Sequence, residues 1–170
     1  VATIGSSAFS ECSRMTRVMV GRSLATLASS SFGGCPAITS LDLQSAFIVG
    51  AAYTAGSSLL DTYFAASKGT IAAVAIGGGV TSVGAYAFYS APALTTVTLE
   101  SGVTTVGDRS FMLCESLTDV TMASSVTTFV ASPFQACSSL EQLTIPSGTT
   151  TIPAEFCHGC TSLPVSYTHL

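Results

Sequence analysis

Charged side chains are scarce in this chain, and their scarcity excludes several classes of protein. Asp, Glu, Lys and Arg make up 8% of the 170 residues, whereas about 25% is usual in soluble domains. Five basic residues and a net charge of −4 provide no positive surface for nucleic acid or for an anionic membrane. Ser, Thr, Gly and Ala must therefore cover most of the surface.

Long apolar runs and targeting signals are also missing. No uninterrupted stretch of about 18 apolar residues occurs, so the sequence predicts no insertion into a membrane. The most apolar segment, TIAAVAIGGGV at 70–80, is short and contains three glycines. The opening residues, VATIGSSAF, lack the basic and apolar segments of a signal peptide. They start within a repeat, and we expect the chain to be part of a longer one.

The chain has few groups that could carry catalysis. Its two histidines, His158 and His169, both lie near the C-terminus, whereas a nucleophile needs a nearby base and a group that orients it. Glu115 and Glu141 occupy similar turns and could form a hydrolytic pair, but solvated loop charges are the simpler interpretation. The three glycines at 77–79 lack the following Lys and helix of a phosphate-binding loop. We expect neither an enzyme nor a cofactor.

What the chain does contain is one pattern written repeatedly. FYSAPALTTVTL at 88–99, FMLCESLTDVTM at 111–122 and FQACSSLEQLTI at 134–145 follow one another at a regular spacing of about 23 residues, and a fixed period in this range predicts a solenoid. A pair of apolar residues marks each repeat at the same spacing, with one longer step between Leu43 and Val74. The pairs are Val18/Val20, Leu41/Leu43, Val74/Ile76, Val97/Leu99, Val120/Met122 and Leu143/Ile145.

Each repeat predicts the same local structures. LTTVTL alternates apolar and polar residues, as a half-buried strand does, and a turn rich in Gly, Ser and Pro follows. A second short apolar pair comes next. The Phe-containing segment after it is too short for an independent helix and predicts a single α- or 3₁₀-helical turn. Because one repeat cannot bury its apolar side alone, successive coils should stack with parallel strands and with columns of equivalent residues, Phe upon Phe.

The pattern V-T-x-[IV]-G-x-x-[AS]-F-x-x-C-x-x-L-x-x-[VL]-T-[IL] resembles the BspA-like class of leucine-rich repeats. It appears here as VTSVGAYAFYSAPALTTVTL and VTTVGDRSFMLCESLTDVTM. The resemblance implies a leucine-rich-repeat solenoid, a right-handed β/α superhelix with a parallel sheet on one face and short helical or 3₁₀ turns on the other. We expect one domain over residues 1–163 with about seven partial or complete coils, an insertion near 44–63, and an irregular tail at 164–170.

Some features depart from the family pattern. The chain has no Asn, so the asparagine ladder of ordinary leucine-rich repeats is missing, as is typical of this subclass. Ala91 replaces the repeat cysteine in one coil. In the last coil Cys157 takes the Phe position and Phe156 comes one residue early. After Leu163 the pattern stops, which leaves the end of the final coil undefined.

The resemblance also implies a class of function. Members are similar to cell-surface and secreted proteins of host-associated bacteria and some protists, described as adhesins or protein-binding scaffolds without enzyme activity in their repeats. A non-catalytic, adhesin-type module with a protein or glycan partner, on a cell surface or secreted, is therefore implied. A purely structural spacer within a larger protein is the main alternative. An ice-binding solenoid and a hydrolase are weaker ones.

The outward positions of the predicted strands form the candidate binding surface, here called the open strand face. They are short, nearly neutral and rich in Thr, which also simply suits exposed strands. The candidate binding residues are Arg17, Met19, Ser40, Asp42, Thr96, Thr98, Asp119, Thr121, Gln142 and Thr144. Three of the threonines align in a column, as an ice-binding lattice requires. The second column, Thr96, Asp119 and Gln142, is mixed.

The insertion near 44–63 is the second candidate. It carries Phe47, Tyr53, Leu59, Leu60 and Tyr63, which could contact a partner. Packing against the coils is the favoured interpretation, because loops this apolar seldom remain exposed.

Five of the six cysteines share one repeat position: Cys12, Cys35, Cys114, Cys137 and Cys160. Column side chains point in parallel, which suits buried free thiols better than disulfides. The segment CHGC at 157–160 contains a single closely spaced pair. A structural zinc site usually needs two such pairs, and a thioredoxin-like motif needs a βαβ context. We therefore expect no metal site.

Overall fold

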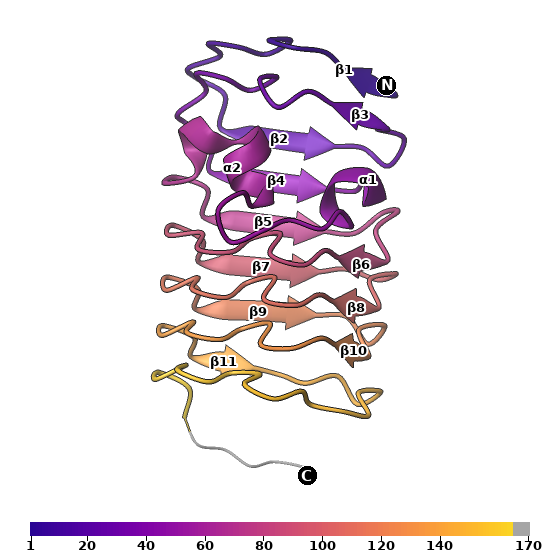
Figure 1. The fold of residues 1–170 in the computed structure, drawn as a ribbon, viewed down its shortest axis with the longest axis vertical. Helices are drawn as coiled ribbons and strands as arrows, with labels where there is room; N and C mark the ends of the chain where they lie inside the picture. The colour runs from indigo at the N-terminus through magenta and orange to yellow at the C-terminus, as the bar shows by residue number, and fades with distance from the viewer. Residues whose placement is uncertain (165–170) are drawn as a thin grey trace.

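The computed structural model describes residues 1–164 as a stack of coils with parallel strands along one side (Figure 1). The strands of the main sheet are β2 (Arg17–Val20), β4 (Ser40–Leu43), β5 (Ala73–Ile76), β7 (Thr96–Leu99), β9 (Asp119–Met122) and β11 (Gln142–Leu143). Neighbours in this sheet are also consecutive along the stack, and all of them pair in parallel. The predicted solenoid with a parallel sheet is confirmed.

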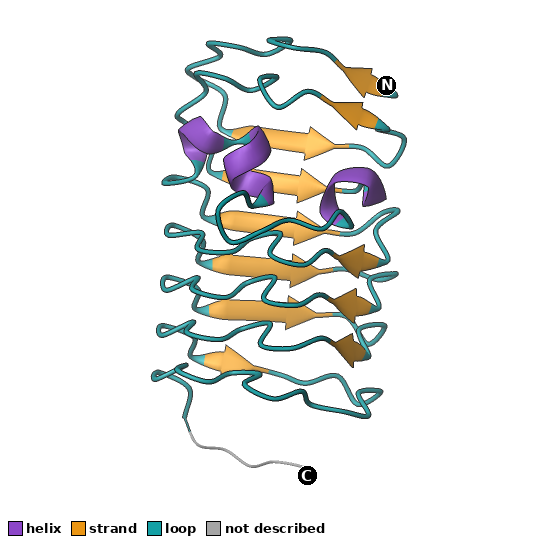
Figure 2. Ribbon diagram, viewed as in Figure 1, coloured by secondary structure: helices purple, strands orange, loops and turns teal. Residues whose placement is uncertain are grey.

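A second set of short strands runs along the stack, as Figure 2 shows in orange. It comprises β1 (Thr3–Ile4) paired with β3 (Thr26–Leu27), and a three-stranded sheet of β6 (Ser82–Val83), β8 (Thr105–Val106) and β10 (Thr128–Phe129). These strands hold the second member of the second apolar pair in each repeat, and Val83 and Val106 are fully buried. Each coil therefore contributes apolar side chains to the core from two directions.

Aromatic columns fill the interior, as the repeat spacing predicts. The Phe88 and Phe111 rings lie 5.3 Å apart with an interplanar angle of 3°, and Phe111 and Phe134 lie 5.6 Å apart at 8°. Phe9 and Phe32 stack in the first coils, with centroids 5.3 Å apart. Stacked rings at this distance contribute beyond the area that they bury. The shared core joins the coils into one hydrophobic unit.

The Phe-containing segments differ from the expectation of a helical turn. In the regular coils they are successive turns, and no helix is assigned to them within residues 1–164. Tyr86 and Ser90, which flank Phe88, have φ values of 56° and 52°. Arg109 and Leu113 flank the next Phe in the same way, at 50° and 62°. Left-handed residues on both sides interrupt any run of right-handed helical backbone.

The expanded coil contains the helices found in the described residues. These are α1 (Ala46–Val49), α2 (Leu59–Tyr63) and the 3₁₀ turn η1 (Ala65–Ser67), drawn in purple in Figure 2. The excursion ends at Phe64, whose ring stacks on Phe32 with centroids 5.0 Å apart. The extra residues therefore bulge outward while Phe64 continues the aromatic column.

The last coil is the least regular. Its strand β11 has two residues, and Ile145, which the repeat places inward, is 37% exposed. The Phe156 ring meets Phe134 and Phe129 nearly edge-on, at interplanar angles of 83° and 81°. Beyond Pro164, the predicted irregular tail lies outside the described residues.

Candidate functional site

The open strand face follows directly from strand geometry. Strands β2 and β7 alternate exposed and buried residues, because successive side chains of a strand point to opposite faces. The structure places all ten predicted residues at outward positions. Ser40 and Asp42 are half-buried and the other eight are exposed.

Parallel register arranges these residues in rows along the stack. Thr98 lies opposite Thr121, and Thr96 lies opposite Asp119, which in turn lies opposite Gln142. Neighbouring strands are about 4.8 Å apart, so each row is a regularly spaced series of side chains. Most of them are short and polar, and Ala73 and Ala75 of β5 lie in the middle of the two rows. The outward positions follow from the repeat length, which keeps the strands in the same phase. That these residues bind a partner stays a prediction.

The face carries few charges. Arg17 and Asp42 form an ion pair across β2 and β4, with Nη2 and Oδ2 separated by 3.7 Å. Arg17 is 66% exposed, and such surface pairs contribute little stability. The pair leaves Arg17 accessible to a partner, whereas the Asp42 side chain is 15% exposed.

A shallow hollow lies at the beginning of β9 and β11. It has a volume of about 240 Å³ and is lined by Thr118, Asp119, Glu141 and Gln142. Sites for small ligands usually enclose about 300–1,000 Å³ and are mostly apolar. This hollow is smaller and polar, and its lining does not include Glu115, the other carboxylate of the hypothetical hydrolytic pair. Its shape suits contact with a larger surface.

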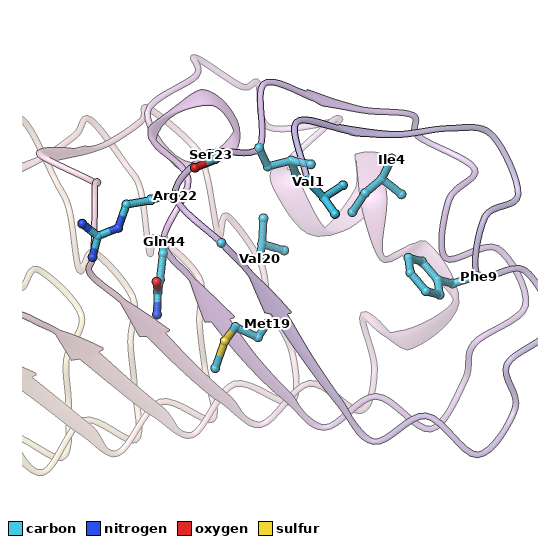
Figure 3. Close-up of a pocket in the computed structure, with 10 residues that line it drawn as sticks. Val1, Ile4, Phe9, Met19, Val20, Arg22, Ser23 and Gln44 are labelled. Carbon is cyan, nitrogen blue, oxygen red and sulfur yellow. The ribbon is translucent and has the colours of Figure 1, made fainter.

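A second hollow, of about 520 Å³, lies at the N-terminal end of the stack (Figure 3). Its apolar lining includes Ile4, Phe9, Val20 and Leu24, with Arg22 and other polar groups at one side. The apolar residues belong to the interior columns, and Phe9 is 39% exposed. This hollow therefore exposes part of the hydrophobic core at the N-terminal end of the stack.

The insertion mainly packs against the coils, although its exposure is uneven. Leu59 and Leu60 are fully buried, whereas Phe47 is 51% exposed. Tyr53 and Tyr63 pack against the core. Burial, together with the neighbouring Tyr63, raises the pKa of Tyr53, whose hydroxyl donates to the Ile48 carbonyl. Packing, the favoured interpretation, describes most of the insertion.

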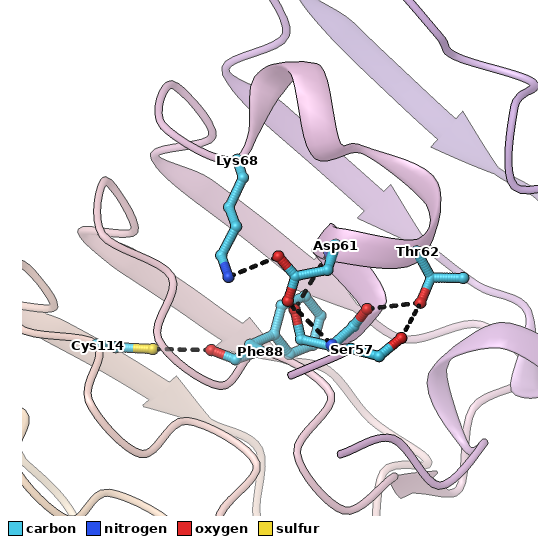
Figure 4. A network of polar contacts seen from close by, with 7 residues as sticks. Ser57, Asp61, Thr62, Lys68, Phe88 and Cys114 are labelled. Carbon is cyan, nitrogen blue, oxygen red and sulfur yellow. Dashed lines mark hydrogen bonds and ion pairs between the residues drawn. The ribbon is translucent and has the colours of Figure 1, made fainter. Parts of the chain in front are cut away.

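Polar contacts fix α2 to its surroundings (Figure 4). The Ser58 hydroxyl accepts from the Asp61 backbone N–H, and the Asp61 carboxylate accepts from the Ser58 backbone N–H, which completes a capping box. Lys68 Nζ lies 2.8 Å from Asp61 Oδ1. Burial alone would raise the pKa of Asp61, but hydrogen bonds from Lys68 and Ser58 outweigh it and lower the pKa.

An aromatic cluster that the sequence reasoning missed lies in the coils beside the insertion. The Tyr86 and Tyr89 rings are 5.5 Å apart. Arg109 places its guanidinium carbon 5.9 Å from the Tyr86 ring centroid, and its Nη1 donates to the Tyr86 hydroxyl at 3.2 Å. Tyr86 and Arg109 occupy positions one repeat length apart, and this spacing was the available signal.

The cysteine column has a role that the spacing alone did not reveal. The thiols of Cys35, Cys114, Cys137 and Cys160 each donate to the carbonyl of a Phe 26 residues earlier, at 3.0–3.2 Å. All four cysteines are buried. Burial raises the pKa of Cys114 to about 12, which keeps that thiol protonated and able to donate. Where the repeat cysteine is present and buried, it therefore connects its coil to the preceding one.

Among residues 1–164, no group of three or more His, Cys, Asp or Glu side chains is arranged to bind a metal ion. None of the helices in this part of the chain has the length and hydropathy that a membrane crossing requires.

Comparison with known families agrees with this geometry. Six copies of the BspA type leucine rich repeat region match residues 1–63 and 57–167. The chain belongs to the BspA-type leucine-rich repeat family. No curated protein matches it in sequence. The coils, the parallel sheet and the repeat cysteine are thus those of a BspA-type repeat module.

Solved structures share the fold of this BspA-type module. A leucine rich cell surface protein from Faecalibacterium prausnitzii is 23% identical with a TM-score of 0.56, over 88% of this chain and 34% of the other. A leucine-rich repeat protein from Eubacterium ventriosum is 25% identical with a TM-score of 0.55, over 64% and 28%. One from Bacteroides ovatus is 20% identical with a TM-score of 0.52, over 95% and 45%. The BspA-type chain thus spans less than half of each of these proteins.

Proposed function

We propose that this BspA-type module is a non-catalytic binding module whose open strand face contacts a protein or a glycan. The observation that carries the proposal is the face itself, where outward side chains of six parallel strands lie in register. They are mostly polar and exposed, apart from the half-buried Ala73 and Ala75 of β5 and the apolar Met19 of β2. The alternate residues of the same strands, such as Val97 and Leu99, are buried in the hydrophobic core. The outward side chains are therefore free to serve a partner.

The composition of the face suits a broad contact. Ser and Thr side chains lose less rotamer entropy than Lys or Glu when a partner immobilises them. Their hydroxyls both donate and accept hydrogen bonds, which matches peptide groups and sugar hydroxyls alike. Extended concave or flat faces are what repeat proteins commonly offer to macromolecules.

A location outside the cell, on a surface or secreted, is part of the same proposal. It is supported by the description of the Faecalibacterium prausnitzii protein as a cell surface protein. The adhesin-type role rests on the family resemblance and on the open strand face together.

The principal alternative is a structural spacer whose binding function lies elsewhere in a longer protein. Thr-rich strands also form without any selection for binding, because Thr has a high β-propensity. An ice-binding surface is disfavoured by the row of Thr96, Asp119 and Gln142, which mixes three kinds of side chain. A thermal-hysteresis measurement on the purified module tests that possibility directly.

Two lysine substitutions on the open strand face test the proposed binding. The Thr98→Lys/Thr121→Lys double variant places bulky charges on adjacent strands. We expect at least a tenfold loss of binding to immobilised host matrix proteins or arrayed glycans that retain the unmodified module. The matched control, Thr104→Lys/Thr128→Lys, adds the same charge at exposed threonines of the short-strand side and should keep full binding.

The outcomes separate the hypotheses. Undiminished binding by Thr98→Lys/Thr121→Lys would exclude the open strand face and direct attention to the insertion. A module that retains no matrix protein and no glycan supports the spacer.

A further inference from the structure

The last coil contains a thiol that no earlier coil has. Cys157 follows Phe134 by one repeat length and so occupies the repeat position of the stacked phenylalanines. Phe156, one residue earlier, closes the aromatic column edge-on against Phe134. Because Phe156 ends the aromatic column, the next position can hold a small side chain. That side chain is Cys157, three residues before the column cysteine Cys160.

The backbone brings these two cysteines close together. The Cys160 N–H donates to the Cys157 carbonyl at 3.1 Å, which defines a tight turn that includes Gly159 with a φ of 81°. The ends of such a turn are less than about 7 Å apart at Cα, which overlaps the span of roughly 4.4–6.8 Å that is typical of disulfides. Interaction with the neighbouring Cys160 thiol, together with burial, raises the pKa of Cys157.

The two thiols differ in accessibility. Cys157 is half-buried, whereas Cys160 is 9% exposed and donates to the Phe134 carbonyl at 3.1 Å. A reagent in solution can therefore reach Cys157 first, and Cys160 lies behind it. In the regular coils a buried phenylalanine occupies the position of Cys157, so this arrangement occurs in the last coil alone among the described residues.

We propose that Cys157 and Cys160 form a dithiol site that small-molecule disulfides, such as oxidised glutathione, convert reversibly to an intramolecular disulfide. The site is independent of the open strand face and of the function proposed for it.

The exchange proceeds in two balanced steps. Cys157 loses its proton and attacks one sulfur of oxidised glutathione, forming a mixed disulfide and releasing one glutathione thiolate. Cys160 then loses its proton and attacks Sγ of Cys157, forming the Cys157–Cys160 bond and releasing the second glutathione thiolate. The two protein protons end on the two glutathione molecules, and two electrons pass from the cysteines to glutathione.

Local interactions favour Cys160 as the second nucleophile. Interactions with the neighbouring Cys137 and Cys157 thiols lower the pKa of Cys160. The interaction with Cys160 and burial raise the pKa of Cys137, whose own thiol donates to the Phe111 carbonyl at 3.2 Å. Cys137 therefore remains a protonated donor in the column, and Cys160 is the better placed of the two to act as the second nucleophile.

The proposal is tested on the intact protein equilibrated with mixtures of reduced and oxidised glutathione. After acid quenching, free thiols are counted under denaturing conditions and the disulfide is mapped by proteolysis and mass spectrometry. We expect the count to fall from six to about four as oxidised glutathione increases, with the bond mapped to Cys157–Cys160. Excess reduced glutathione should restore the lost thiols.

Single variants separate the two cysteines. Cys160→Ser should stop at a mixed disulfide between Cys157 and glutathione, whereas Cys157→Ser should form no intramolecular disulfide at Cys160. Cys137→Ala should still lose two thiols. A bond mapped to Cys137–Cys160, equal oxidation of Cys157→Ser, or no oxidation of the wild-type protein by millimolar oxidised glutathione would each overturn the proposal.

Discussion

At the residue scale, the repeat depends on backbone conformations that its amino-acid types do not predict. Tyr86, Ser90, Arg109 and Leu113 all have positive φ, which costs a residue with a Cβ about 1–2 kcal/mol. Each directs its N–H to a carbonyl of the next coil, at 2.9–3.0 Å. Glycine is the usual sequence signal for this conformation. Because these positions hold other residues, the sequence predicted the period but not the turns.

Glycine is required at a different position, where coils approach closely. A Cβ built on Gly107 would lie 2.5 Å from the Val83 carbonyl oxygen, whereas at Gly5, the same repeat position, nothing lies within 4 Å. We expect Gly107→Ala to lower the free energy of unfolding by about 2 kcal/mol. Gly5→Ala, the matched control, should change it little. Denaturant titration gives both values, and equal effects would show that close coil contact is not the cause.

At the element scale, the expanded coil shows what periodicity can and cannot predict. The one longer step in the repeat located the insertion and its buried leucines, but not α1 and α2. Helices of four and five residues cannot form alone and depend on tertiary packing. The pairing of Ser58 with Asp61 three residues later was a usable start signal for α2. The aromatic continuation through Phe64 required the structure, since its spacing from Phe32 departs from the repeat.

The capping box makes α2 sensitive to mutation and to acid. Ser58→Ala should lower the free energy of unfolding by about 1 kcal/mol and reduce the hydrogen-exchange protection of α2. The exposed neighbour substitution Ser57→Ala is the control and should have a smaller effect.

The pH dependence has a defined sign. Because the pKa of Asp61 is lowered in the folded state, its stabilising contribution is present above the unfolded pKa of about 3.9. That contribution disappears as the pH falls through the folded pKa. The free energy of unfolding of Asp61→Asn should therefore fall less between about pH 5 and pH 2 than that of the wild type. Parallel acid profiles would assign the acid sensitivity to other carboxylates.

At the scale of the whole molecule, stability is shared between neighbouring coils. The ten outward residues and the stacked phenylalanines follow from one period, so the sequence predicted both the fold and the shape of the candidate site. The cysteine-to-carbonyl bonds did not follow, because they depend on how adjacent coils are offset. The repeat spacing of Tyr86 and Arg109 indicated their proximity but not their contact geometry. Stacks held by nearest-neighbour contacts are expected to open from their ends.

The aromatic column offers a test of that expectation. Phe111 is fully buried between two stacked rings, whereas Phe9 has one stacked neighbour and is 39% exposed. Phe111→Ala should lower the free energy of unfolding by about 4 kcal/mol, and Phe9→Ala by less than half of that. Native-state hydrogen exchange should show the strongest protection in β5, β7 and β9. Uniform protection along the stack would instead indicate a single cooperative unit.

The hydrogen bonds between coils run in two opposed senses. Beside the strands, donors point to the preceding coil, as from Thr118 to Thr95, while in the Phe segments they point to the following one, as from Phe88 to Ser110. Peptide dipoles on the two sides therefore oppose each other along the axis, unlike those of an α-helix. Adding whole coils therefore does not build up a large dipole along the axis. The length of the protein can change in evolution without that electrostatic cost.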